Sequence, residues 1–314
     1  MSINEKKDIS KFSDDILKQI QAEIDRRGEM PGSLDELNKI ASEVTDKYNK
    51  AAVPDFEGLS PHRMFSILNR PFSGECPVTF NPSVNPAILA SIPVIRVCLL
   101  IIDAIRAENG LKLTPKGNLP RKIVNEIFSL NLYTKTNSKY LPTKVLNEDE
   151  FIPAAYTRAL MKLAGLVTIR KNKLLLTKTG REPFDPVLLF RSLFTMFETD
   201  FHKGYLDGYE SGAIGNTGAL YVIYLLHRYG HEQREASFYA SLYFKAFPDL
   251  ISAIQPSPFS NQETMAYECF IYRTFDKGFF LFGLVDIEYK GKNYSDRKMY
   301  IKITEAFHQV FKIE

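Results

Sequence analysis

The stretch that most constrains the fold runs from Ile152 to Gly180, where a helical pattern is followed by two short strands. Apolar side chains recur at helical spacing as far as Gly165-Leu166-Val167. The basic turn Arg170-Lys171-Asn172-Lys173 then separates a first strand from a second, Leu174 to Thr177. This order is typical of the third helix and β-wing of a winged-helix domain.

The residues before this stretch complete the same topology. A helix from Pro93 to Asn109, a short strand from Leu111 to Thr114 and a helix from Leu119 to Leu130 precede it, and residues 131–150 form a polar insertion. A chance helix followed by a hairpin is the main alternative. It would not explain the strand at Leu111, which gives the wing a third partner.

The pattern is repeated near the end of the sequence, where Gly283-Leu284-Val285 leads through a turn to Tyr300 to Thr304. This second copy has no obvious first strand. Helices are expected before it at 186–201, 217–229, 234–247 and 262–282. We therefore predict a mainly α fold of α+β character, with tandem winged-helix units, small β-wings and an N-terminal helical hairpin.

Charge divides the chain in the same way. The 314 residues, enough for two or three domains, carry a net charge of +3. Residues 92–182 hold 16 Lys and Arg against 7 Asp and Glu, a net +9, whereas residues 1–91 and 183–314 each have a net charge of −3. A local positive excess attracts polyanions, because each neutralised phosphate releases counterions.

These patterns divide the sequence into four parts. Within residues 1–50, Ser33 and Glu36 form a capping box that predicts the start of a second helix. The four parts are a helical hairpin arm (1–50), a Pro-rich connector with one short helix (51–91), the basic winged-helix domain (92–182), and a helical region ending in a second winged-helix-like unit (183–314).

Four motifs resemble a family of uncharacterised bacterial proteins with winged-helix units. They are Leu59-Ser60-Pro61 with Met64 and Pro71-Phe72, LTPKGNLP from Leu113 to Pro120, GYLDGY from Gly204 to Tyr209, and the run from Tyr224 to Gly230. The resemblance covers roughly residues 55–310. The family has no established activity, so the resemblance implies no mechanism, and the Cys-rich zinc motif that ends some relatives is absent from this sequence.

The basic segment supplies the candidate nucleic-acid-binding residues. The core-facing positions of the third helix leave Arg158 and Lys162 one turn apart on an outer face. With the wing and the start of the preceding helix, the set is Arg121, Lys122, Arg158, Lys162, Arg170, Lys171 and Lys173. We expect these side chains to contact phosphates of nucleic acid, DNA before RNA, and only Arg158 is suited to a guanine contact.

The rival interpretation is a protein-interaction adaptor. Winged helices also dock proteins, and lysines are common on solvated surfaces. In either case we expect a regulatory or accessory protein, not an enzyme, whose residues 1–50 and 183–314 hold a protein partner or a second subunit.

The GYLDGY turn is the one weak candidate for catalysis. His202, Asp207 and Glu210 lie in or beside it and could converge. An aspartate in such a turn more often hydrogen-bonds its own backbone. No P-loop, GxSxG or GxGxxG motif occurs, and we expect no cofactor.

Metal chemistry has little support. His227 and His231 stand four residues apart, but Gly230 lies between them and is expected to end the helix. Cys76, Cys98 and Cys269 form neither a disulfide framework nor a metal motif. We expect no metal site.

The composition favours a cytoplasmic location. Three scattered cysteines suit a reducing compartment. Residues 1–15 are polar and acidic, unlike a signal peptide, and the most apolar run, 92–105, contains two charged residues and is too short to span a bilayer. We expect no membrane partner.

Overall fold

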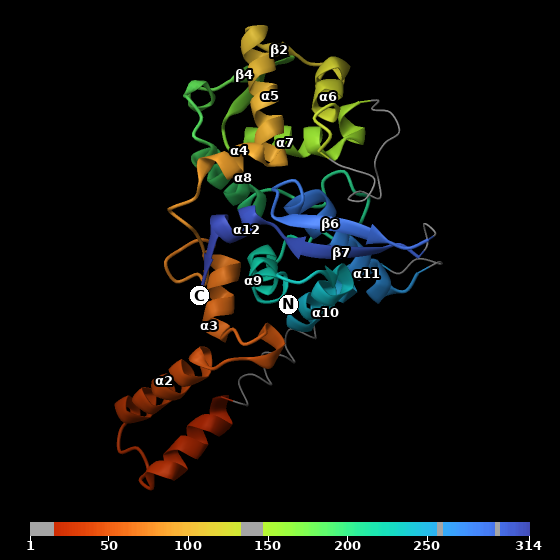
Figure 1. Cartoon of the computed structure of the whole chain (residues 1–314). Coiled ribbons are helices and arrows are strands. Elements are labelled where there is room, and N and C mark those ends of the chain that lie inside the picture. The colour runs from red at the N-terminus through yellow and green to blue at the C-terminus, as the bar shows by residue number, and fades with distance from the viewer. Residues whose placement is uncertain (1–15, 133–146, 256–259, 293–295) are drawn as a thin grey trace. The chain divides into compact units, whose positions relative to one another are not determined.

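The computed structural model describes residues 16–132, 147–255, 260–292 and 296–314. The chain packs as two compact units, Met1–Ser66 and Ile67–Glu314. The described residues are mainly helical and carry three small antiparallel sheets (Figure 1). The prediction of a mainly α fold with α+β character is confirmed. Most of the insertion expected at 131–150 lies outside the described residues.

The first unit contains two helices, residues 16–27 and α2 (Leu34–Lys50), followed by the short helix η1 (Pro54–Phe56). Helix α2 begins after Ser33, whose hydroxyl accepts the Glu36 N–H, as the capping box predicted. The Glu36 carboxylate accepts the Gly32 N–H at 2.9 Å. A small core of Ile24, Ile40 and Val44 joins the two helices.

Helix α3 (Pro61–Asn69) spans the boundary between the units, and the segment after it is more regular than expected. Besides the one short helix expected in the Pro-rich connector (51–91), this segment contains the strand β1 (Val78–Phe80) and the helix α4 (Pro86–Ser91). Strand β1 pairs with β8 (Phe311–Ile313), Val78 opposite Ile313. The sequence pattern missed this strand because its partner lies more than 200 residues away.

The basic segment forms a group of helices on a small sheet (Figure 1). Its sheet has the strand order β2-β4-β3, so the first strand pairs with the last. The residues of the turn between β3 and β4, Lys171 and Asn172, both have positive φ, 48° and 56°, which suits a two-residue hairpin loop. The elements are α5 (Pro93–Ala107), β2 (Leu111–Lys112), α6 (Arg121–Phe128), η2 (Glu148–Glu150), α7 (Ile152–Leu163), β3 (Val167–Arg170), β4 (Lys173–Leu176) and η3 (Thr179–Arg181).

The remaining chain repeats this strand order in a second sheet, β5-β7-β6. The expectation that this copy has no first strand is wrong, because Arg234 and Glu235 form β5 opposite Ile301 and Tyr300. Two charged residues show no apolar alternation, so only the backbone pairing reveals the strand. The elements are α8 (Pro186–Thr199), α9 (Ala219–Tyr229), β5 (Arg234–Glu235), α10 (Ala236–Ala246), η4 (Pro248–Ala253), α11 (Gln262–Ile271), η5 (Tyr272–Phe279), β6 (Val285–Lys290), β7 (Lys298–Ile303), α12 (Glu305–Val310) and β8.

The long helix expected at 262–282 changes its winding at Tyr272. From there to Phe279 it is a π-helix, an uncommon element in which backbone hydrogen bonds span five residues. All of its eight residues except Tyr272 are buried, including Arg273 and Lys277. Burial of two cations requires partners that the helical pattern alone cannot specify.

An aromatic core centred on α8 packs beneath these elements. Phe194 contacts Phe282 at a centroid distance of 4.9 Å and Phe311 at 5.3 Å, and Phe197 contacts Phe282 at 5.0 Å. Edge-to-face and tilted ring contacts of this kind stabilise beyond the area that they bury. No helix within the described ranges has the length and apolarity to cross a membrane.

Candidate functional site

The sheet of the basic segment carries a row of three cations on its outer face. Lys112 of β2 is paired with Lys173 of β4, and Lys173 is paired with Arg170 of β3. Side chains directly opposite each other in a sheet project on the same side, so the three follow one line across the strands. Their neighbours along β4, Leu174 and Leu176, are buried, so the row faces outward.

The three cations are exposed, and no described carboxylate forms an ion pair with any of them. Like charges directly opposite each other in a sheet destabilise it. An arrangement that is unfavourable for the free protein becomes favourable when a polyanion lies along it, because phosphates replace the mutual repulsion with attraction.

The hairpin tip is fixed to the loop that precedes α6. The Asn172 side-chain amide donates to the carbonyl oxygens of Leu113 (3.0 Å) and Thr114 (3.3 Å). Lys171, beside Asn172, is exposed. The hairpin that carries these cations is therefore held at its tip by two side-chain hydrogen bonds.

Arg121 and Lys122, at the start of α6, are both exposed. The first turn of α6 contains no acidic residue and its cap position, Pro120, provides no side-chain hydrogen bond. Positive charge at a helix N-terminus is unfavourable, which again suits an anionic partner. Lys122, however, also borders a groove with Asp103 and Glu126, so its surroundings are of mixed charge.

Arg158 does not lie on an open outer face as expected. Its guanidinium binds the carboxylate of Glu148, whose side chain is fully buried, while that of Arg158 is 16% exposed. The other Glu148 oxygen accepts the Leu119 N–H at 2.7 Å. Arg158 thus neutralises a buried carboxylate that joins the start of α6 to α7, whereas Lys162, one turn further on, is exposed.

The N-terminal half of α7 is covered on all sides. Five consecutive residues, 153–157, are buried, and five residues span more than one full helical turn. Tyr156 packs on Phe201 at 4.7 Å, and its hydroxyl lies 2.8 Å from the Lys203 carbonyl oxygen and 3.0 Å from that of Tyr205. The face of α7 at Tyr156 is therefore covered by the chain from residue 201 to 205.

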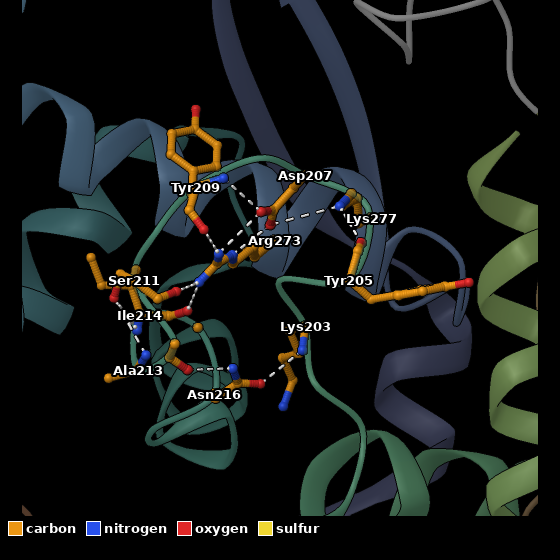
Figure 2. Close-up of polar contacts among 12 residues, drawn as sticks. Lys203, Tyr205, Asp207, Tyr209, Ser211, Ala213, Ile214, Asn216, Arg273 and Lys277 are labelled. Carbon is orange, nitrogen blue, oxygen red and sulfur yellow. Dashed lines mark hydrogen bonds and ion pairs between the residues drawn. The ribbon is translucent and has the colours of Figure 1, made fainter. Parts of the chain in front are cut away.

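The GYLDGY turn is held by a buried ion pair (Figure 2). Asp207 accepts from Arg273 Nε at 2.6 Å and from Nη2 at 3.1 Å, and Lys277 Nζ lies 3.7 Å away. Asp207 also accepts the Tyr209 N–H at 2.9 Å, which confirms the expected hydrogen bond to its own turn.

Every N–H group of Arg273 is used by this turn and the loop that follows it. Besides Asp207, Arg273 donates to the carbonyl oxygens of Ser211 (2.6 Å), Ile214 (2.8 Å) and Tyr209 (3.2 Å). A guanidinium has five N–H groups, and all five have acceptors here. The pair therefore organises the loop and has no donor left for a ligand.

The catalytic candidate gains no supporting geometry from this arrangement. His202 and Glu210 are exposed, and the polar contacts that the structure gives Asp207 are those to Arg273, Lys277 and its own turn. Within the buried cluster the pKa of Arg273 is raised by its hydrogen bond to Asp207 against the effect of burial, whereas the pKa of Lys277 is lowered. Burial lowers its pKa to about 8, partly opposed by Asp207, and its Nζ donates to the Tyr205 carbonyl oxygen at 2.9 Å.

Histidines converge elsewhere, beside the second sheet. His231 lies between His227, at a ring-centroid distance of 6.3 Å, and His308, at 5.0 Å. The helix α9 ends at Tyr229 with Gly230 as its cap, as expected. Within the described residues, no group of three or more His, Cys, Asp or Glu side chains is arranged to hold a metal ion.

The candidate contact residues read from the sequence omitted Lys112, which lies in the cation row. They contained Arg158, which forms an ion pair with Glu148. The two-residue turn at Lys171-Asn172 sets Arg170 opposite Lys173, and this register is readable from the sequence. The addition of Lys112 requires pairing between strands about 60 residues apart. Nothing in the pattern around Arg158 shows that Glu148 is buried beside it.

Comparison with known proteins gives a family match for the same region. Residues 90–186 match the family described as the Y4jL N-terminal domain. The matched range nearly coincides with the basic segment 92–182. No curated protein and no solved structure matches the chain.

Proposed function

We propose that residues 92–182 form a winged-helix unit that binds nucleic acid through phosphate contacts, and we rank DNA ahead of RNA as its target. The observation that carries the proposal is the row Lys112, Lys173 and Arg170 on the outer face of the sheet. Helix, strand, helix, helix and β-hairpin follow each other in this segment, and the strand order β2-β4-β3 is the one that a winged helix requires.

The proposed contact set is narrower than the sequence alone indicated. It contains the row together with the exposed Arg121, Lys122, Lys162 and Lys171. Arg158 is excluded because its charge is neutralised by Glu148. The protein then binds without reading base sequence, since phosphate contacts position a protein but carry no sequence information.

The second sheet, β5-β7-β6, with α9, α10 and α11 supports a second winged-helix unit in the same proposal. Its segment is acidic overall, and the π-helix η5 that continues α11 holds Arg273 and Lys277 in the buried network with Asp207. We propose that this second unit and residues 1–50 bind a protein partner or a second subunit.

One observation favours the rival, an adaptor that binds only protein. The covered face of α7 removes the surface with which winged helices usually read DNA. The adaptor would leave the cation row without an anionic partner, and we therefore rank it second.

The test is a fluorescence-anisotropy titration of random duplex DNA at about 50 and about 200 mM salt, where binding through several phosphates weakens by orders of magnitude. Changing Lys171→Glu and Lys173→Glu together is expected to weaken binding. It should also reduce the salt slope by about 0.9 for each phosphate that the variant no longer neutralises.

The matched control changes two exposed lysines outside the segment, Lys292→Glu and Lys312→Glu, which alters the net charge equally. The control is expected to bind almost as the unchanged protein does. Equally weakened binding in both variants would show a general charge effect and contradict the wing assignment. Absence of binding at either salt would favour the adaptor.

A further inference from the structure

A hollow of about 250 Å³ opens beside the sheet of the basic segment. Its floor is apolar and includes Ile105, Leu175 and Leu176, and its polar lining is provided by Arg106, Asn109 and Arg181. Leu175 lies two residues beyond Lys173 on β4, so alternation along the strand places it on the face that carries the cation row. Leu176, which also lines the hollow, belongs to the buried face, so the hollow lies at the end of β4, next to the face that carries the row.

The polar lining is suited to an anion. Arg106 and Arg181 are both exposed, and no described carboxylate lines the hollow. The Asp103 carboxylate lies 3.8 Å from the Arg106 guanidinium and is 76% exposed, a contact too weak to neutralise it. The Arg106 guanidinium also lies 5.8 Å from the centre of the Phe184 ring, within the range of a cation–π attraction.

The charge and shape of the hollow favour one kind of phosphate group as its ligand. An internal phosphodiester carries one negative charge, whereas a phosphate monoester carries close to two near pH 7. Two guanidiniums match a monoester, and each can bind it by paired hydrogen bonds. The apolar floor suits the sugar or base that adjoins the phosphate, and a hollow admits a strand end more readily than the continuous backbone of a duplex.

We propose that this hollow binds the terminal phosphate of a nucleic-acid strand, with Arg106 and Arg181 on the phosphate and Leu175 under the adjoining nucleotide. The proposal rests on the proposed function, because the cation row would guide the strand that ends in the hollow. The protein would then prefer strands with a phosphorylated end, although it does not read their base sequence.

The experiment compares labelled DNA duplexes of one sequence that carry a 5′-phosphate, a 3′-phosphate or only hydroxyl ends. We expect one of the phosphorylated ends to bind about tenfold more tightly or better, since hydrogen bonds to charged groups are among the stronger ones. Arg106→Gln and Arg181→Gln should each remove this preference and leave the hydroxyl-ended duplex bound nearly as before.

Lys178→Gln is the matched control, because Lys178 is exposed, lies near Arg181 in the chain and does not line the hollow. It should keep the preference. Thermal unfolding of each variant separates a local effect from a loss of folding. Equal affinity for all three duplexes would overturn the proposal and leave the proposed function standing.

Calorimetry with adenosine monophosphate distinguishes a strand end from a free nucleotide. Binding of the monophosphate that depends on Arg106 and Arg181, without any preference among duplex ends, would overturn the strand-end assignment in favour of a small nucleotide. Failure of every duplex to bind would overturn the proposed function together with this inference.

Discussion

Asp207 and Arg273, 66 residues apart in the chain, form a bidentate ion pair in which both side chains are fully buried. The pair gives the aspartate of the GYLDGY turn a structural role. Its aspartate supplies the charge that allows an arginine to be buried in the π-helix, and the backbone carbonyls of the same loop take up the remaining N–H groups of that arginine.

The first prediction concerns this pair. Asp207→Asn leaves the Arg273 charge buried without a counter-ion, so we expect the free energy of unfolding to fall by about 3 to 5 kcal/mol. Urea denaturation followed by circular dichroism measures the change. Glu210→Gln, an exposed carboxylate in the same loop, should change it by less than about 0.5 kcal/mol. A similar small effect for both variants would mean that the pair does not hold the loop.

The second prediction separates a structural arginine from a binding one. Arg158→Gln leaves Glu148 buried without its cation, and we expect a decrease of about 3 kcal/mol in the free energy of unfolding. Affinity for duplex DNA, measured below the unfolding transition, should stay within about twofold. A large decrease in affinity with unchanged stability would return Arg158 to the contact set.

The third prediction follows from the cation row. Lys173→Glu places a carboxylate between Lys112 and Arg170, so repulsion becomes attraction and the free energy of unfolding should rise by about 0.5 to 1 kcal/mol. DNA affinity should fall in the same variant. Lys162→Glu, on α7 and outside the row, provides the comparison, since it should weaken binding without stabilising the protein. A destabilised Lys173 variant would contradict the alignment of the three side chains.

The fourth prediction is a pH dependence from the three clustered histidines. Burial, and then the nearby His231, lower the pKa of His227 and of His308 below the ordinary value of 6.5, with Glu305 opposing the shift at His308. The unfolded chain therefore binds protons more readily than the folded protein. Stability from these groups is fully present above about pH 6.5 and is lost as the pH falls through the lowered values.

The measurement compares the free energy of unfolding at about pH 7.5 and about pH 5.5, on either side of the ordinary histidine pKa. His231→Gln removes one source of repulsion, so this variant should lose less stability on acidification than the unchanged protein. His62→Gln, which changes a histidine outside the cluster, is the matched control. Proton NMR of the ring protons should show the pKa values of His227 and His308 rising in the His231 variant, and unchanged values would contradict the coupling.

The local elements were readable from the sequence because their causes are local. Apolar periodicity set the helices, Ser33 set the start of α2, Gly230 the end of α9, and the turn at Lys171-Asn172 set the hairpin that carries the proposed contacts. The repeated hairpin near the C-terminus followed from the same short-range rules.

The pairings between distant residues were decided by tertiary structure. The sequence by itself determined most of the longer helices, the two hairpins and the concentration of positive charge in residues 92–182. Only the folded chain placed Lys112 beside Lys173, gave Arg234 and Glu235 a strand partner, and buried Glu148 against Arg158. The physical reason is that a charged side chain follows no periodic rule. Whether it faces solvent or neutralises a buried group depends on what the rest of the chain brings next to it.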